Sequence, residues 1–154
     1  MKTHPTAVLL VLLLSLGVAP AALADDGLIK KKSPHGVTET IDRLQGALES
    51  KGITIVVRWK HSDKAAGAGI EMRPTELLVF GNPKLGSHLM TSAQSVGIDL
   101  PMKALAWQDA SGQVWLAYND PDYIAARHGI TDRPEIIAKM TKALNAMTDK
   151  AIAP

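Results

Sequence analysis

Residues 53–60 read Ile-Thr-Ile-Val-Val-Arg-Trp-Lys, and this stretch decides the fold class. Four large apolar side chains, Ile53, Ile55, Val57 and Trp59, recur at every second position. A period of two is typical of a β-strand, so the stretch predicts a strand with one strongly buried face. Because helical patterns precede and follow it, the chain is predicted to mix strands and helices in one α+β domain.

The helices are predicted from apolar side chains at helical spacing. The first has Val37, Ile41, Leu44 and Leu48 on one face and is ended by Lys51-Gly52. A short second helix is expected over residues 85–96, a third after Asp120-Pro121, and a last one over about 134–151. The last helix has an apolar stripe of Ile137, Met140, Leu144 and Met147.

Four further strands are predicted, over residues 27–32, 76–80, 101–107 and 114–118. The last two are expected to form a hairpin around the turn at residues 109–112, which ends in glycine. The segment His-Ser-Asp-Lys-Ala-Ala-Gly-Ala-Gly, residues 61–69, is small and rich in glycine and predicts a loop.

The first 24 residues have the pattern of a secretory signal peptide. Lys2 precedes an apolar run from Ala7 to Val18, and Ala22-Leu23-Ala24 forms a cleavage site. We therefore expect cleavage after Ala24, a single domain over residues 25–154, and a periplasmic or secreted location. An apolar run of this length is too short to span a bilayer comfortably, so no integral membrane span is expected after cleavage.

Composition excludes several classes of function. The 154 residues contain no cysteine, which removes disulfides, thiolate catalysis and iron–sulfur clusters. Lys2 is the one charged residue among the first 24, so the mature chain has 16 basic and 15 acidic side chains. This balance, with 4% aromatic residues, argues against nucleic acid as a partner.

No catalytic or metal motif is present. The four histidines of the mature chain, His35, His61, His88 and His128, do not form an H-E-x-x-H or other helical pair. No serine lies in a G-x-S-x-G elbow. We therefore predict no metal ligands and leave the cofactor unassigned.

Polar residues at the predicted ends of strands and at turns form the candidate ligand-binding set. These candidates are His61, Arg73, Asn82, Asp99, Lys103, Tyr118, Asp120 and His128. Asp99 and Lys103 flank the start of an apolar strand. A partly buried ion pair is expected there, either between these two residues or with Arg73. A structural role explains such a pair more simply than acid–base chemistry does.

The stretches RPTELLVFGNP at residues 73–83 and YNDPDYIAARHG at 118–129 resemble the family named domain of unknown function 302. The resemblance covers about residues 27–130 and leaves the last helix outside it. It implies an antiparallel sheet with helices packed on one face, in the order β-α-β-β-β-β-α of the saddle seen in TATA-binding protein, and a homodimer. Similar members have Asp-His where this chain has Lys60-His61, so an Asp–His dyad is not expected at this position.

Three functions are consistent with these features. The first is an exported module that binds a small molecule or assembles as a dimer. The second is an acid–base or metal-assisted enzyme that uses His61 with Asp99, Lys103 or His128. The third is a copper- or haem-handling protein that uses His61, His128 and methionines.

Overall fold

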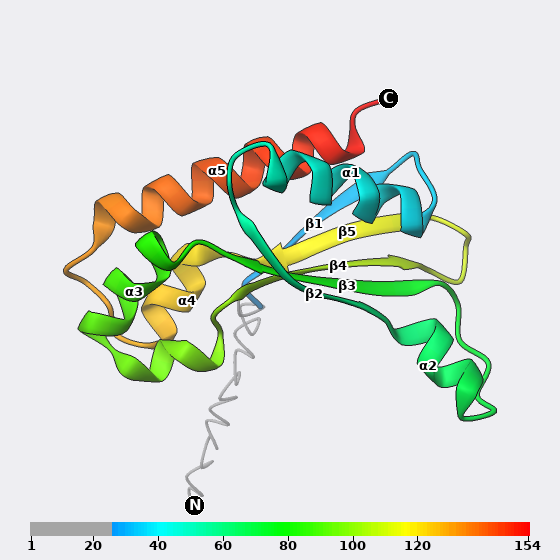
Figure 1. Cartoon of the computed structure of the whole chain (residues 1–154), viewed down its shortest axis with the longest axis horizontal. Helices are drawn as coiled ribbons and strands as arrows, with labels where there is room; N and C mark the ends of the chain where they lie inside the picture. The colour runs from blue at the N-terminus through cyan, green and yellow to red at the C-terminus, as the bar shows by residue number, and fades with distance from the viewer. Residues whose placement is uncertain (1–25) are drawn as a thin grey trace, which may run out of the picture.

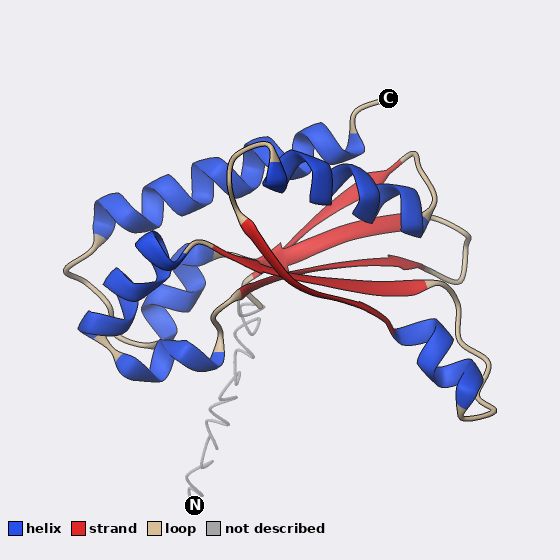
Figure 2. Cartoon of the chain, in the orientation of Figure 1, coloured by secondary structure: helices blue, strands red, loops and turns tan. Residues whose placement is uncertain are grey.

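The chain folds into one antiparallel five-stranded sheet with two long helices packed on one face, as a computed structural model shows for residues 26–154 (Figures 1 and 2). The predicted signal segment, residues 1–24, lies outside the described residues. The strands are β1 (Leu28–Ser33), β2 (Thr54–Lys60), β3 (Thr75–Gly81), β4 (Met102–Gln108) and β5 (Val114–Asn119). The helices are α1 (Val37–Glu49), α2 (His61–Gly67), α3 (Pro83–Ser92), α4 (Pro121–Arg127) and α5 (Pro134–Ile152), with a 3₁₀ turn η1 (Gln94–Ile98).

The spatial strand order is β1-β5-β4-β3-β2, and every neighbouring pair is antiparallel. All five predicted strands are confirmed, and β4 and β5 form the predicted hairpin. The strands and α1 follow one another along the chain as expected, and α3 lies within the region of the predicted second helix, while α2 is an additional helix between β2 and β3.

Helices α1 and α5 cover the same face of the sheet, which we call the inner face (Figure 1). The apolar stripe of α5 is buried as its spacing predicts, and the three large residues Ile41, Leu44 and Leu48 of α1 are fully buried. Gly52 lies in the turn between α1 and β2 with φ of 68°. Glycine adopts this conformation without the steric cost that a Cβ atom would add.

The prediction for β2 was wrong about its buried face. The register shifts between Ile55 and Val57, so a β-bulge separates these two residues. A bulge adds one residue to a strand and reverses the direction of the side chains beyond it. Ile55 therefore pairs with the inner-face residue Phe80, whereas Val57 and Trp59 point to the other face and are 42% and 44% exposed.

The prediction of a loop over residues 61–69 was also wrong, because residues 61–67 form α2. Two alanines near its end favour a helix, and Gly69 follows with φ of 74°. The helix predicted over residues 85–96 is divided: α3 ends before Ala93, whose extended backbone (φ −147°, ψ 107°) separates it from η1.

Within residues 26–154 no helix packs across the second face of the sheet, which we call the open face. In Figure 1, α2 projects to this side at one end of the sheet, and the η1 and α4 region lies at the other end. Strand alternation directs the following side chains to it: Leu28, Lys30, Lys32, Val57, Trp59, Thr75, Leu77, Val79, Lys103, Leu105, Trp107, Trp115, Ala117 and Asn119. No helix of the described residues has the length and apolar character that crossing a membrane requires.

Candidate functional site

The concave feature with the properties of a ligand site is an apolar pocket of about 450 Å³ at one end of the sheet. The start of β2 and the end of β3 form its floor, α3 and the segment from Gly97 to Met102 form one wall, and α5 forms the other. Its lining residues are Ile53, Thr54, Val56, Phe80, Gly81, Asn82, Pro83, Leu85, Gly86, Ser87, Met90, Gly97, Leu100, Pro101, Met102, Met140, Ala143, Leu144 and Met147.

The chemistry of this lining is almost entirely apolar. None of the lining side chains is charged, and the polar side chains are Thr54, Asn82 and Ser87. Four of the six methionines of the chain line the pocket. Methionine is unbranched and polarizable, so it adapts its shape to an irregular apolar ligand.

Two glycines, Gly81 and Gly86, allow neighbouring segments of the pocket wall to approach each other closely. A Cβ atom at Gly81 would lie 3.3 Å from the Pro101 Cβ, so β3 and the start of β4 approach closely there. A Cβ at Gly86 would meet the Leu100 Cδ1 at 3.5 Å, an ordinary contact distance. Asn82 belongs to the predicted site set, and its Oδ1 accepts a hydrogen bond from the Lys84 backbone N–H at 3.0 Å, which caps α3.

Two of the predicted residues, Asp99 and His128, meet between η1 and α4. Together with Ser95 and Arg127 they form what we call the Asp99 cluster. The Nε2 atom of His128 lies 2.7 Å from Asp99 Oδ2, and its Nδ1 lies 2.9 Å from Ser95 Oγ. Arg127 Nη1 donates to Asp99 Oδ1 at 3.3 Å. Both side chains of the Asp99–His128 pair are less than a tenth exposed.

This cluster has the residue types of a serine-hydrolase triad in a different arrangement. In such triads the acid binds Nδ1 and the serine binds Nε2, whereas here the two ring nitrogens are reversed. Because both nitrogens already have hydrogen-bond partners, neither is available to a metal. The cluster therefore ties α4 to η1 and secures one end of the sheet.

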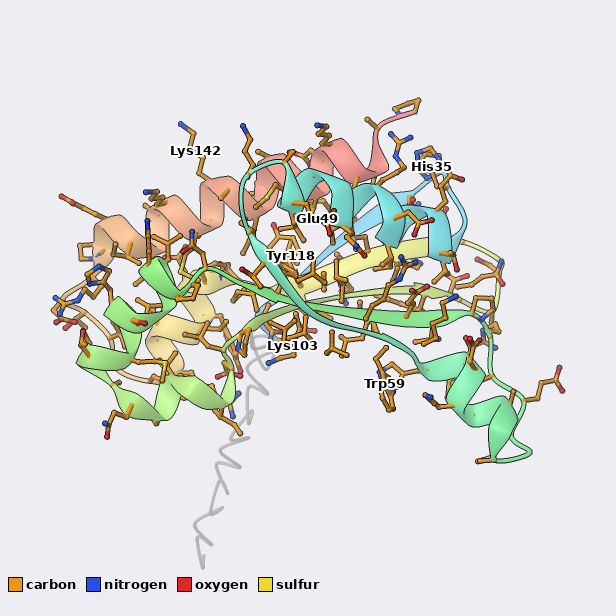
Figure 3. The ribbon with its side chains drawn as sticks, in the orientation of Figure 1. His35, Glu49, Trp59, Lys103, Tyr118 and Lys142 are labelled. Atoms are coloured by element: carbon orange, nitrogen blue, oxygen red, sulfur yellow. The ribbon has the colours of Figure 1, made fainter. Side chains whose placement is uncertain are left out.

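The ion pair predicted between Asp99 and Lys103 does not form. Lys103 Nζ donates to the backbone oxygens of Asp99 and Pro101, at 3.0 and 3.3 Å, and its side chain belongs to the open face (Figure 3). Arg73 does not reach this region either, since its Nε donates to the Gln108 backbone oxygen at 3.1 Å.

His61 stands apart from the other predicted residues. It begins α2, at the opposite end of the sheet from α4 and His128 (Figure 1). Within residues 26–154 its ring makes no hydrogen bond or ion pair, and no group of three His, Asp or Glu residues is arranged to hold a metal ion. The structure therefore does not bring His61 together with Asp99, Lys103 or His128.

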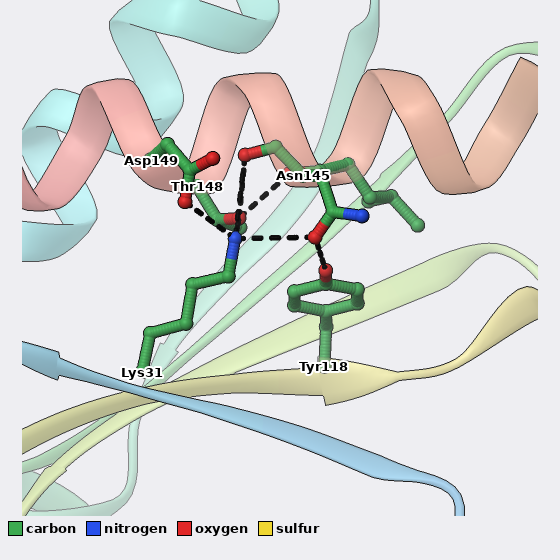
Figure 4. Close-up of polar contacts among 6 residues, drawn as sticks. Lys31, Tyr118, Asn145, Thr148 and Asp149 are labelled. Carbon is green, nitrogen blue, oxygen red and sulfur yellow. Dashed lines mark hydrogen bonds and ion pairs between the residues drawn. The ribbon is translucent and has the colours of Figure 1, made fainter.

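Tyr118 and Asp120 have structural partners. Asp120 Oδ1 accepts from the Asp122 backbone N–H at 3.0 Å and caps α4. The Tyr118 hydroxyl donates to Asn145 Oδ1 at 2.7 Å, on the inner face (Figure 4). Burial raises the pKa of this phenol above its usual range.

Lys31 completes the same polar cluster beneath α5. Its Nζ donates to Thr148 Oγ1 at 2.8 Å and to Asn145 Oδ1 at 3.2 Å, and it pairs with Asp149 Oδ1 at 2.6 Å (Figure 4). Strand alternation thus separates the Lys30-Lys31-Lys32 run, with the middle lysine on the inner face and its two neighbours on the open face.

Sequence reasoning missed most of the pocket, because its walls come from segments far apart along the chain. It also missed Ser95 and Arg127 as partners of Asp99. The available signal for the pocket was the methionine content of the last helix, which helical packing alone explains equally well.

Comparison with known proteins identifies a family match and a similar solved structure, both without an assigned role. The model of the family described as "Domain of unknown function DUF302" matches residues 29–147. The fold is similar to the crystal structure of an uncharacterized conserved protein of that family from Bacillus stearothermophilus. The TM-score is 0.74 at 23% identity, covering 82% of this chain and 99% of that one.

Curated relatives have a higher sequence identity to this chain than that solved structure has. A protein named fluoride-specific ion channel FluC 1, from Brucella suis biovar 1 (strain 1330), is 44% identical over 110 residues, which are 71% of this chain and 43% of that protein. The protein of the same name from Brucella abortus biovar 1 (strain 9-941) is 44% identical over 110 residues, 71% of this chain and 41% of its own length. This chain therefore spans less than half the length of these curated relatives.

Proposed function

This chain belongs to the DUF302 family of domains of unknown function, and we propose that it is an exported module that binds a small apolar molecule. The observation that supports this proposal is the uncharged pocket of about 450 Å³. Small-molecule sites are clefts of about 300–1,000 Å³, lined mainly by apolar side chains with a few polar groups. Asn82, Thr54 and Ser87 would supply the polar contacts that orient the ligand.

The chemical class of the ligand follows from the lining. A charged group placed inside would lose its hydration without gaining a countercharge, which is unfavourable. The ligand is therefore uncharged in the part that enters the pocket. Flexible methionines on three sides fit an aliphatic or aromatic body better than a rigid polar one.

The neutral fluorescent probe N-phenyl-1-naphthylamine tests this proposal. Ala143 is half-buried and lines the pocket on α5, so Ala143→Phe should fill it and weaken probe binding at least about tenfold. Ala146 is exposed on the same helix and does not line the pocket, which makes Ala146→Phe the matched control. Equal probe binding by both variants, with circular dichroism showing that both are folded, would place the probe elsewhere.

Export remains part of this proposal. The Lys2 n-region, the apolar run and the Ala22-Leu23-Ala24 site support cleavage after Ala24 and a periplasmic or secreted protein. Sequencing the N-terminus of protein recovered from the periplasm should give Asp25 as the first residue. The homodimer implied by the family resemblance is a separate proposal, which light scattering of the purified protein tests.

A second candidate function is suggested by the names of the relatives. The matched segment is 41–43% of proteins named fluoride-specific ion channels, so a related domain is joined to a longer protein of that name. We propose on this basis that the module works beside a membrane transport protein. Co-purification of this chain with the Brucella suis relative lacking its matched segment would support the association, and failure of the two to associate in detergent would count against it.

A further inference from the structure

All three tryptophans of the chain point to the open face of the sheet. Trp107 and Trp115 are directly opposite each other on β4 and β5, and Trp59 lies opposite Leu77 on β2 and β3. Figure 3 shows Trp59 on the side of the sheet away from α1 and α5. Because the inner face contains none, the tryptophan content of the protein is confined to one surface.

The register continues this apolar surface across the sheet. Trp59 pairs with Leu77, Leu77 with Leu105, Leu105 with Ala117, and Ala117 with Lys30. With neighbouring strands about 4.8 Å apart, this row crosses about 19 Å of sheet. Trp59 is 44% exposed, Leu77 and Leu105 are partly exposed, and the small Ala117 is buried among its neighbours. No helix within residues 26–154 covers this apolar row, and an apolar surface of that extent marks an interaction site.

The charged strand residues that point to the open face are all lysines, while two carboxylates lie at its edges: Asp26 Oδ2 is 4.0 Å from Lys30 Nζ, and Asp109 Oδ2 accepts from Trp115 Nε1 at 2.8 Å. Lys30, Lys32 and Lys103 point to it, and none of the strand residues that share this face is acidic. Lysines also lie over the indole rings, with Lys32 Nζ 5.6 Å from the Trp115 ring centre and Lys64 Nζ 4.9 Å from that of Trp59. The surface therefore presents aromatic rings and ammonium groups together.

Exposed aliphatic side chains lie on the elements that border this face. Ile98, at the end of η1, is 74% exposed, and Ile70, in the connection after α2, is 59% exposed. Figure 1 shows α2 and the η1 region projecting from opposite ends of the sheet to the open side. Aliphatic groups on such projections, beside tryptophan and lysine, are typical of proteins that rest on a bilayer surface.

A second copy of this chain is a poorer partner for the same face. Two such faces in contact would bring together Lys32 and Lys103 of each copy, neither of which pairs with a carboxylate of the described residues, and like charges facing each other oppose association. Anionic phospholipid headgroups satisfy the ammonium groups, while the interfacial region of a bilayer accepts indole rings. We propose that the open face is a peripheral docking surface for an anionic lipid bilayer, independent of the apolar pocket.

Tryptophan fluorescence tests this proposal directly, because all three indoles lie on the proposed surface. Vesicles of mixed phosphatidylcholine and phosphatidylglycerol should bind the protein in co-sedimentation and shift its emission to shorter wavelength. Pure phosphatidylcholine vesicles should bind far less, and high salt should release the protein from the mixed vesicles.

Matched charge variants locate the contact. Lys30→Gln with Lys32→Gln removes two ammonium groups from the open face, and binding should fall about fivefold for each lysine. Lys142→Gln with Lys150→Gln removes the same charge from exposed positions on α5, on the other side of the molecule, and should leave binding nearly unchanged (Figure 3). If residues 1–24 are retained, they are the same in all variants, so their contribution to vesicle binding does not affect the comparison.

Three results would overturn the proposal. One is the absence of binding to mixed vesicles, and another is an equal loss of binding in both double variants, which would reflect net charge alone. The third is a blue shift that depends on protein concentration without lipid, since a second copy would then cover the face.

Discussion

The buried ion pair between Arg58 and Glu76 should couple strongly in the free energy of unfolding. Glu76 is 2% exposed on the inner face, where its carboxylate pairs with Arg58 Nε and accepts from Thr38 Oγ1 at 3.2 Å. Arg58 is a quarter exposed and also pairs with Asp42 Oδ1 at 2.5 Å. Both carboxylates raise the pKa of the guanidinium, with the hydrogen bond to Glu76 the largest cause.

The two ends of this pair differ in what their removal leaves behind. Arg58→Met leaves a buried carboxylate with only Thr38 as a partner, so we expect it to destabilise the fold by about 3 kcal/mol. Glu76→Leu leaves a guanidinium that reaches solvent and keeps Asp42, so its cost should be about 1–2 kcal/mol. The double variant replaces the pair by apolar groups and should lie within about 1 kcal/mol of the wild type.

Urea unfolding of all four proteins, followed by circular dichroism, measures these free energies. The expected coupling energy is at least about 3 kcal/mol, because the two single losses greatly exceed the loss in the double variant. Additive losses, or an Arg58→Met cost below about 1 kcal/mol, would show that the pair contributes little and that the reasoning about its burial is wrong.

Three further measurements address individual groups. Hydrogen bonds from the Ser111 hydroxyl and the Trp115 indole lower the pKa of the Asp109 carboxyl to about 2. The contribution of the ionised carboxylate to stability should be complete above about pH 4 and lost as the pH falls to about 2. Ser111→Ala should raise the midpoint of the Asp109 titration followed by carbon NMR. Burial raises the pKa of Tyr118, so its phenol should titrate above the usual range in ultraviolet absorbance, and stability should fall as the pH rises above about 10. His128→Ala should destabilise the fold by about 2–3 kcal/mol, because it leaves the buried Asp99 carboxylate with Arg127 as its one weak partner. Arg127→Ala should change stability by less than about 1 kcal/mol, because the Arg127 side chain is 53% exposed. Thermal melts that rank the two variants in reverse would contradict this prediction.

The strands were predictable because period-two patterning depends only on neighbouring residues. The direction of Val57 and Trp59 was not, because the bulge that reverses it arises from pairing with β3. Similarly, glycine-rich composition predicted a loop at residues 61–69, yet Ala65 and Ala66 sustain a short helix before Gly67 and Gly69 end it. Local composition there supported both outcomes.

The candidate site was predictable only in part. Asp99, Lys103 and His128 lie at or next to element ends, as the sequence indicates, but their partners depend on how η1 and α4 pack. Asn82 lies at the pocket, whereas most of the lining is ordinary apolar sequence from β2, β3, α3 and α5. Nothing local distinguishes a methionine that fills a core, such as Met147, from one that also borders a cavity.

Native mass spectrometry of protein purified gently from the periplasm tests the ligand-binding proposal most directly. We predict a mass above that of the polypeptide beginning at Asp25, lost on denaturation, present in Ala146→Phe and absent or reduced in Ala143→Phe. A bare polypeptide in the wild type, together with no binding of N-phenyl-1-naphthylamine, would contradict the proposal that the pocket of about 450 Å³ is a ligand site.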